Sequence, residues 1–209
     1  MDGMKKFLAI DTSASDLIVI ARGENTAILR VENCAMNHSV KLLETVERAL
    51  AEAHTRLSDL DFFACVLGAG SFTGIRIGMS TIKAFCDGEQ KPALGVTSFD
   101  CAAYTTGEKS TLTLVSAGHG YYYACGYAAD KKVILPPSYL SGEEVETLAC
   151  GYETIVSRET LPFSGAVKID PAEGLLRATE AKSEAGAFCA SDELEAVYVR
   201  RSQAEENRK

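Results

Sequence analysis

Side chains able to bind phosphate or a metal ion stand at the end of the first predicted strand. Asp11 closes that strand, and the hydroxyl groups of Thr12 and Ser13 follow it directly. In acidic phosphotransferase folds, a carboxylate and hydroxyls in this position can hold magnesium and phosphate. An aspartate that caps a turn explains the same placement, and physical chemistry alone favours this second interpretation. Both interpretations stay open on the sequence alone.

A glycine-rich loop is the second candidate for anion binding. Residues 68–74 read Gly-Ala-Gly-Ser-Phe-Thr-Gly and lie between a predicted strand and a predicted helix, where α/β proteins place anions against the helix N-terminus. The G-x-G-x-x-x-G spacing is one residue longer than the dinucleotide-binding fingerprint, and no Gly-Lys-Ser/Thr follows as in a P-loop. Gly70 is therefore a candidate contact in a vestigial phosphate site with residues 11–13, while a turn without a ligand fits the spacing equally well.

Two glycines stand one turn apart inside the helix that follows this loop. Gly74 and Gly78 each cost about 1 kcal/mol relative to alanine in a helix interior. Something should offset this loss of roughly 2 kcal/mol. The simplest explanation is the close backbone approach of another helix, either within the fold or across an interface.

The three histidines do not predict a metal site. His38, His54 and His119 include no H-x-x-x-H pair, and none lies beside a carboxylate at ligand spacing. We expect His38 to join Asn37 in starting a helix. No metal ion and no other cofactor is predicted.

Cysteine and tyrosine residues indicate packing rather than catalysis. Seven cysteines are scattered without a C-x-x-C pair, a pattern typical of reduced thiols in a cytosol. A thiol nucleophile needs a positively charged niche near a histidine, whereas Cys65 lies in a predicted buried strand and Cys101 on a predicted helix. Tyr121, Tyr122 and Tyr123 are a candidate stacking platform, but alternate side chains of a strand point to opposite faces, so half of these rings should pack.

The elements that position these residues follow from hydrophobic periodicity and turn signals. Apolar residues spaced three and four apart predict a helix over residues 39–54, and Thr97 with Asp100 forms a capping box. The first hundred residues read β-β-β-α-β-α-β-α, with strands at 7–11, 17–22, 26–31, 62–67 and 93–96 and helices at 39–54, about 73–87 and 97–104.

The pattern restarts after a small boundary at residues 105–109. Strands are predicted at 111–116, 121–128 and 154–157, and helices at 141–150 and 171–181. Pro136-Pro137 is predicted to interrupt regular secondary structure, and residues 194–199 form a final extended piece. We therefore expect two α/β domains, at residues 1–106 and 107–209.

Composition and charge exclude several classes of protein. The 209 residues include 29 acidic and 21 basic side chains, and the net charge of −8 disfavours a stand-alone nucleic-acid binder. No apolar run approaches the roughly 18 residues that span a bilayer. The short apolar run at residues 7–10 is too short for a signal-peptide core. We expect a cytoplasmic protein with no membrane partner.

Five segments together resemble the TsaB (YeaZ) family. They are residues 8–13, 37–39, 68–78, 80–83 and 95–100, among which the Gly-Ser-Phe-Thr-Gly-x-Arg-x-Gly stretch is the most specific. The likeness is close over residues 6–104 and weaker beyond, at the hairpin near 116–127 and at 197–200. That family is the non-catalytic dimerisation subunit of the bacterial machinery that makes N6-threonylcarbamoyladenosine at position 37 of tRNAs reading ANN codons.

The resemblance implies an ASKHA (actin-like, Hsp70-like, ribonuclease H-like) fold of two α/β lobes, the second reduced. It implies pairing through the first two helices, either with a second copy or with the catalytic subunit TsaD, and places the glycine pair on that surface. TsaE would join the complex, and tRNA would be reached only through it. The contact residues implied are His38, Ser39, Leu42, Val46, Thr73, Gly74, Arg76, Ile77, Gly78 and Thr81, with Lys41 and Lys83 nearby.

The sequence departs from the family pattern at two places, and two other functions stay open. Ala69 stands where many members have proline, and Ser116-Ala117-Gly118 stands where a hairpin often reads Asp-Ala-Arg. One alternative is an ASKHA phosphotransferase that grips ATP with residues 11–13 and the glycine loop. The other is a metallopeptidase, which is an older description of TsaD relatives. The spacing of the three histidines argues against this alternative.

Overall fold

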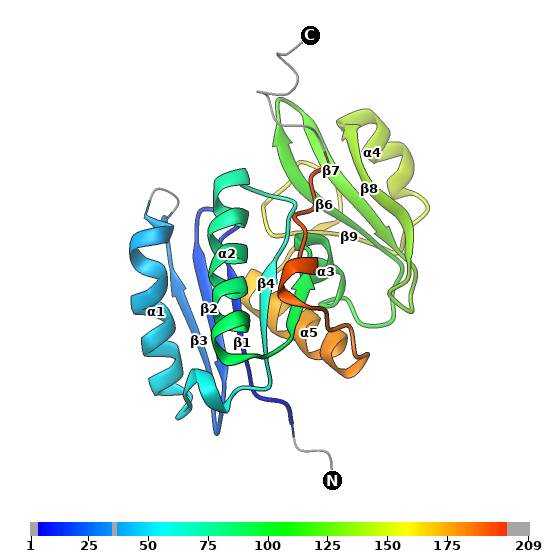
Figure 1. Ribbon diagram of the computed structural model, residues 1–209. Helices are drawn as coiled ribbons and strands as arrows, with labels where there is room; N and C mark the ends of the chain where they lie inside the picture. Colours follow the sequence, from blue (N-terminus) through cyan, green and yellow to red (C-terminus); the bar gives the residue numbers. More distant parts are fainter. Residues whose placement is uncertain (1–3, 35–36, 200–209) are drawn as a thin grey trace.

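The computed structural model describes residues 4–34 and 37–199, which form two five-stranded sheets with helices packed around them (Figure 1). The first sheet has the strand order β3-β2-β1-β4-β5, in which β1 pairs antiparallel with β2 and parallel with β4. Its central strands are buried along their whole length, as expected for strands covered on both faces. The strands are β1 (Phe7–Asp11), β2 (Leu17–Arg22), β3 (Thr26–Val31), β4 (Phe62–Val66) and β5 (Ala93–Val96).

Helices cover both faces of the first sheet. α1 (His38–Glu52) and α2 (Phe72–Glu89) lie side by side on one face, where they bury apolar side chains against the strands (Figure 1). α3 (Ser98–Ala103) and α5 (Pro171–Glu184) pack on the other face. With a short 3₁₀ turn, η1 (Leu57–Asp59), added before β4, the predicted order β-β-β-α-β-α-β-α is confirmed.

Local capping explains why α2 and α3 begin where they do. The Ser71 hydroxyl accepts a hydrogen bond from the backbone N–H of Gly74 at 3.2 Å. Thr97 and Asp100 form the predicted capping box at the start of α3, with both reciprocal hydrogen bonds present. These caps fix the two helix N-termini that face the gap between the sheets.

The second sheet has the order β10-β9-β6-β7-β8 and carries one helix of its own. The predicted strands at 111–116, 121–128 and 154–157 are confirmed, and Ser141 and Glu144 form a capping box at the start of the helix. The short strand β10 was not predicted. The elements are β6 (Thr111–Gly118), β7 (Tyr121–Tyr127), β8 (Val133–Ser141), α4 (Gly142–Ala149), β9 (Thr154–Ser157) and β10 (Ala166–Lys168).

The predicted break at Pro136-Pro137 is wrong, because β8 runs straight through both prolines. β8 is an edge strand, where a missing N–H removes few ladder hydrogen bonds. Its pairing with β7 also shifts register between Ala124 and Gly126, opposite the prolines. The two prolines are thus accommodated by an irregular edge rather than by a turn.

The C-terminal part of the chain returns to the first sheet. α5 buries Leu175 and Ala178 against β1, β4 and β5, although it follows the second sheet in sequence. The two sheets also share an apolar cluster, in which Phe99 from α3 packs near Val115 and Tyr127. The boundary at residues 106–107 falls between α3 and β6 and stays a prediction.

None of the helices within residues 4–34 and 37–199 combines the length and the hydropathy needed to cross a membrane.

Candidate functional site

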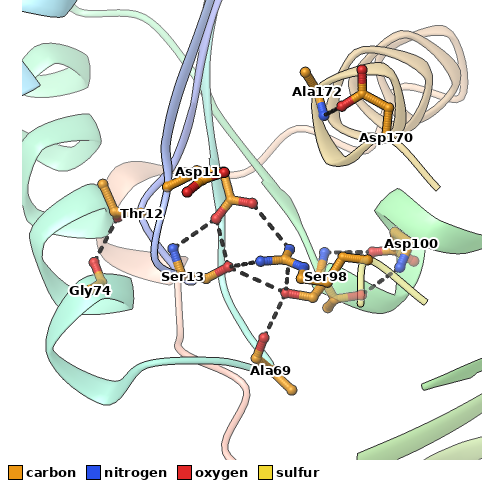
Figure 2. Close-up of polar contacts among 12 residues, drawn as sticks. Asp11, Thr12, Ser13, Ala69, Gly74, Ser98, Asp100, Asp170 and Ala172 are labelled. Carbon is orange, nitrogen blue, oxygen red and sulfur yellow. Dashed lines mark hydrogen bonds and ion pairs between the residues drawn. The ribbon is translucent and has the colours of Figure 1, made fainter. Parts of the chain in front are cut away.

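The predicted phosphate site forms a buried corner at the carboxyl end of β1. The Asp11 side chain accepts hydrogen bonds from the backbone N–H of Ser13 at 2.7 Å and from its hydroxyl at 2.6 Å. Ser98 enters from the start of α3 and donates to the carbonyl oxygen of Ala69 at 2.6 Å. Figure 2 shows Asp11, Ser13 and Ser98 converging on one point. The aspartate therefore caps its own turn, as the simpler interpretation predicted.

Thr12 points away from this corner toward helix α2. Its hydroxyl donates to the carbonyl oxygen of Gly74 at 2.7 Å, and Figure 2 shows the two residues facing each other. Gly70 packs against Ser13, so closely that a Cβ there would overlap the Ser13 carbonyl oxygen. The glycine loop and residues 11–13 are thus brought together as predicted, but they contact each other.

An arginine from the second sheet completes the corner. Arg158 follows β9, and its guanidinium donates to Asp11 Oδ2 at 3.1 Å, to Ser13 Oγ at 3.1 Å and to Ser98 Oγ at 3.2 Å. The side chains of the ion pair are 8% exposed for Arg158 and 2% exposed for Asp11. Sequence reasoning missed Arg158, because it is 147 residues from Asp11 and no local motif marks it.

The corner opens into a cleft of about 710 Å³ between the two sheets. The first sheet and its loops contribute Asp11, Ser13 and Gly70, and the second sheet contributes Tyr123. The hairpin that departs from the family pattern also reaches this cleft, because Ser116 and Ala117 line it. The cleft therefore lies at the junction of the two sheets, directly beside the Asp11 corner.

Asp100 provides a second polar link between the sheets. It accepts hydrogen bonds from the Tyr127 hydroxyl of β7 at 2.9 Å and from Lys182 of α5 at 2.7 Å. Burial, followed by the charge of Asp100, raises the pKa of the Tyr127 phenol above its usual range. Tyr127 consequently stays protonated and keeps donating to Asp100.

The predicted interface role of the glycine pair is wrong. Gly74 and Gly78 are buried in α2, and both face Thr12 of the same lobe. A Cβ at Gly74 would overlap the Thr12 carbonyl oxygen, and a Cβ at Gly78 would lie 2.5 Å from its hydroxyl oxygen. Close packing of α2 on the end of β1 therefore accounts for both glycines without a partner.

Three further residues of the predicted interface also point into the lobe. His38, Leu42 and Val46 are buried between α1 and the first sheet, at 2%, 1% and 2% exposure. They do not reach the surface. The apolar residues spaced three and four apart, from which the helix was predicted, form the side of α1 that packs on the sheet. The other predicted contacts lie at or near the surface: Ser39, Thr73 and Arg76 are exposed, and Ile77 and Thr81 are half-buried.

The outer surface of α1 and α2 carries apolar side chains that the sequence prediction omitted. Val40 is 70% exposed, Leu43 is 56% exposed and Phe72 is 41% exposed. A signal for α1 was available, because Val40 and Leu43 fall outside the apolar stripe that packs on the sheet. We call the outward side of these two helices, with Val40, Leu43, Phe72 and Arg76, the α1–α2 face.

The C-terminal segment adds an aromatic ring to this face. Tyr198 stacks on Phe72, with ring centroids 5.0 Å apart, and its hydroxyl accepts a hydrogen bond from Arg76 Nε at 3.1 Å. The Arg76 guanidinium carbon also lies 3.8 Å from the Phe72 ring centroid. The backbone N–H of Val197 donates to the Leu67 carbonyl at 2.8 Å and fixes the segment beside α2.

The remaining candidates for chemistry are structural. Cys65 and Cys101 are buried, as predicted, and burial raises the pKa of both thiols. Tyr122 packs inward on Phe163 while Tyr121 is 41% exposed, so the predicted alternation is confirmed. In the part of the chain that the structure describes, no group of three or more His, Cys, Asp or Glu side chains could hold a metal ion.

Comparisons with known proteins agree on one family. The family model described as "TsaD: tRNA N6-adenosine threonylcarbamoyltransferase" matches residues 31–165. Among curated proteins, the tRNA threonylcarbamoyladenosine biosynthesis protein TsaB of Escherichia coli (strain K12) is 29% identical over 147 residues, 68% of this chain and 62% of that protein. TsaB of Buchnera aphidicola subsp. Schizaphis graminum is 28% identical over 145 residues, 68% of this chain and 67% of that protein. The alignment spans less than two thirds of the E. coli protein's length.

Solved structures show the same fold over nearly the whole chain. A Pseudomonas aeruginosa protein described as similar to the peptidase YEAZ superposes with a TM-score of 0.79 at 23% identity, covering 94% of this chain and all of that one. YeaZ from Pseudomonas aeruginosa gives a TM-score of 0.73 at 20% identity, covering 93% of this chain and all of that one.

Proposed function

Since the chain belongs to the TsaD family, and within it to the TsaB (YeaZ) proteins, we propose that it is a non-catalytic partner subunit in the synthesis of N6-threonylcarbamoyladenosine on tRNA. Its two-lobed α/β architecture belongs to the ASKHA class, as the resemblance implied. The modified nucleoside would be the one at position 37 of tRNAs that read ANN codons. The complex would work in the cytoplasm, with this chain as an accessory subunit rather than the enzyme.

The observation that carries the proposal is the exposed apolar centre of the α1–α2 face. Val40 and Leu43 project from one helix and Phe72 from its neighbour, all more than 40% exposed. Apolar side chains grouped on one surface mark a protein–protein contact more often than scattered ones do. A partner that covered them would gain the area that these side chains expose to water.

The charges around this apolar centre favour an acidic partner surface. The Nε group of Arg76 donates to Tyr198, and no carboxylate of residues 4–34 or 37–199 pairs with this guanidinium. Within the described part of the chain, Lys83 donates only to the Asp192 carbonyl oxygen, at 3.4 Å, whereas Lys41 already pairs with Glu44 at 3.1 Å. Arg76 and Lys83 would therefore meet acidic groups of the partner, each exposed pair contributing about 0–1 kcal/mol.

We assign the catalytic subunit TsaD as the occupant of this face. Docking of helix against helix, with a total buried area of about 1,600 Å², would stabilise the active arrangement of TsaD. TsaD would then transfer the threonylcarbamoyl group, and TsaE would supply ATP-driven turnover within the complex. A second copy of the chain could cover the same face when TsaD is absent. The net charge of −8 fits a subunit that reaches tRNA only through its partners.

Co-purification with the cognate TsaD tests the proposal. Leu43→Glu places a carboxylate in the apolar centre, and we expect it to weaken the complex at least about 100-fold, because a buried unpaired charge is costly. Ile134→Glu is the matched control, since Ile134 is 58% exposed on β8 of the second sheet. It should bind TsaD like the unchanged chain. An unaltered complex with Leu43→Glu would refute the α1–α2 face as the docking surface.

A further inference from the structure

The corner at the end of β1 does not fit the magnesium–nucleotide group that an ASKHA fold implies. Asp11 uses Oδ1 for Ser13 and Oδ2 for Arg158, so neither carboxylate oxygen is left without a partner. The Ser13 and Ser98 hydroxyls are likewise engaged by Arg158. A magnesium ion placed here would meet a buried guanidinium instead of free oxygen ligands.

We propose that Arg158 is a built-in cation that takes the place of a metal ion at this corner and clasps the two sheets together. Its guanidinium comes from the end of β9 in the second sheet, whereas all three acceptors belong to the first sheet and the helix beside it. The side chain is more than nine-tenths buried, so solvent screens the contact little. Arg158 supplies the positive charge that a buried Asp11 requires.

The rest of the cleft supports this assignment. Its second aspartate, Asp16, accepts hydrogen bonds from Arg30 at 2.8 and 2.6 Å, so this carboxylate is also neutralised within the chain. Glu159 and Lys168 supply one further charge of each sign along the lining. The described residues that line the cleft thus offer no pair of free carboxylates to a divalent ion, and their charges balance without a ligand.

The clasp can be removed without dissolving the contact between the sheets. The apolar cluster of Phe99, Val115 and Tyr127 and the hydrogen bond from Tyr127 to Asp100 both remain. Arg158→Ala would then release the Oδ2 atom of Asp11 and one acceptor position on each of the Ser13 and Ser98 hydroxyls, a set of hard oxygen ligands that suits a divalent cation. The variant should therefore gain affinity for a cation that the unchanged chain does not bind.

Thermal unfolding and direct cation binding of the full chain test the inference. We expect Arg158→Ala to melt roughly 10 °C below the unchanged chain in EDTA. Millimolar Mn²⁺ should recover part of that loss, and electron paramagnetic resonance should detect the bound ion. Arg158→Ala combined with Asp11→Asn should melt above Arg158→Ala and show no response to Mn²⁺. Arg177→Ala is the matched control, because Arg177 pairs with Glu173 on the exposed side of α5.

Two results would overturn the inference. One is stoichiometric binding of Mg-ATP to the unchanged chain in calorimetry, abolished by Asp11→Ala, which would also favour the phosphotransferase alternative. The other is a melting temperature of Arg158→Ala equal to that of Arg177→Ala. If Arg158→Ala does not fold, the melting temperatures and Mn²⁺ responses of Arg158→Lys and of Arg158→Ala with Asp11→Asn are compared instead. The outcome is independent of TsaD binding, which the α1–α2 face determines.

Discussion

In the interlobe cleft, the Asp11 carboxylate and the hydroxyls of Ser13 and Ser98 all have partners within the chain. On the outer side of α1, by contrast, Val40 and Leu43 are 70% and 56% exposed. The polar groups of the cleft are therefore satisfied within the chain, whereas the apolar side chains on the outer side of α1 stay exposed. The contrast supports our proposal that this chain keeps the architecture of the fold while its function lies on an outer helix surface instead of in the cleft.

The largest expected effect is on stability, at the glycines by which α2 packs against the end of β1 inside the first lobe. Gly74→Ala should lower the free energy of unfolding by about 3 kcal/mol, because the new Cβ would overlap the Thr12 backbone. Gly88→Ala, on the same helix, should raise it by about 1 kcal/mol, since a Cβ there meets nothing within 4 Å. Chemical denaturation measures both changes. A stable Gly74→Ala chain that no longer binds TsaD would return this glycine to the docking surface and break the comparison.

A smaller effect is expected where the C-terminal segment joins the α1–α2 face. Tyr198→Ala removes the ring that stacks on Phe72 and the hydroxyl that positions Arg76, so affinity for TsaD should fall about 10-fold. Tyr121→Ala is the control, because Tyr121 is similarly exposed and stacks on Tyr139 in the second sheet. Isothermal titration with purified TsaD compares the two. Equal affinities would confine the docking surface to the helices.

The smallest effect is a pH dependence at the rim of the cleft. Burial raises the pKa of Asp16, but the hydrogen bonds from Arg30 and from the Asn33 backbone together lower it by more. The net shift of this pKa is therefore downward. A lowered pKa in the folded state contributes stability that is present above the unfolded pKa and is lost as pH falls through the folded value. Asp16→Asn should thus cost about 1 kcal/mol or less at neutral pH and nothing in strong acid.

Melting curves from pH 7 to pH 2 measure this difference for Asp16→Asn, with Asp59→Asn on the exposed η1 turn as control. A difference in melting temperature between Asp16→Asn and the unchanged chain that grew toward acid pH would contradict the downward shift of the Asp16 pKa. It would mean that the cleft does not neutralise this carboxylate.

The first lobe was predictable because its signals are local. Alternating and continuous apolar runs marked β1 to β5, and the capping box of Thr97 and Asp100 fixed the start of α3. The same local reasoning treated Pro136-Pro137 as a break, because sequence does not show that β8 lies at an edge. Strand position in a sheet is set by the whole topology rather than by the residues themselves.

The candidate site was predictable only in part. Residues 11–13 and Gly70 were brought together as expected, since a strand end and the next strand's loop meet at one sheet edge. Arg158 was missed because its contact closes a loop of 147 residues, a distance over which periodicity carries no information. The outward residues Val40 and Leu43 could have been found, had apolar residues outside the buried stripe of α1 been counted.

The consecutive prolines of β8 have a consequence for how copies of this protein can associate. Neighbouring residues of a strand direct their N–H groups to opposite sides, so one of the two missing donors always falls on the free edge. That edge also carries the exposed apolar residues Val133 and Ile134, which would otherwise invite a strand from another chain. Growth of the sheet from molecule to molecule, the first step toward fibrils, is thereby obstructed at this edge.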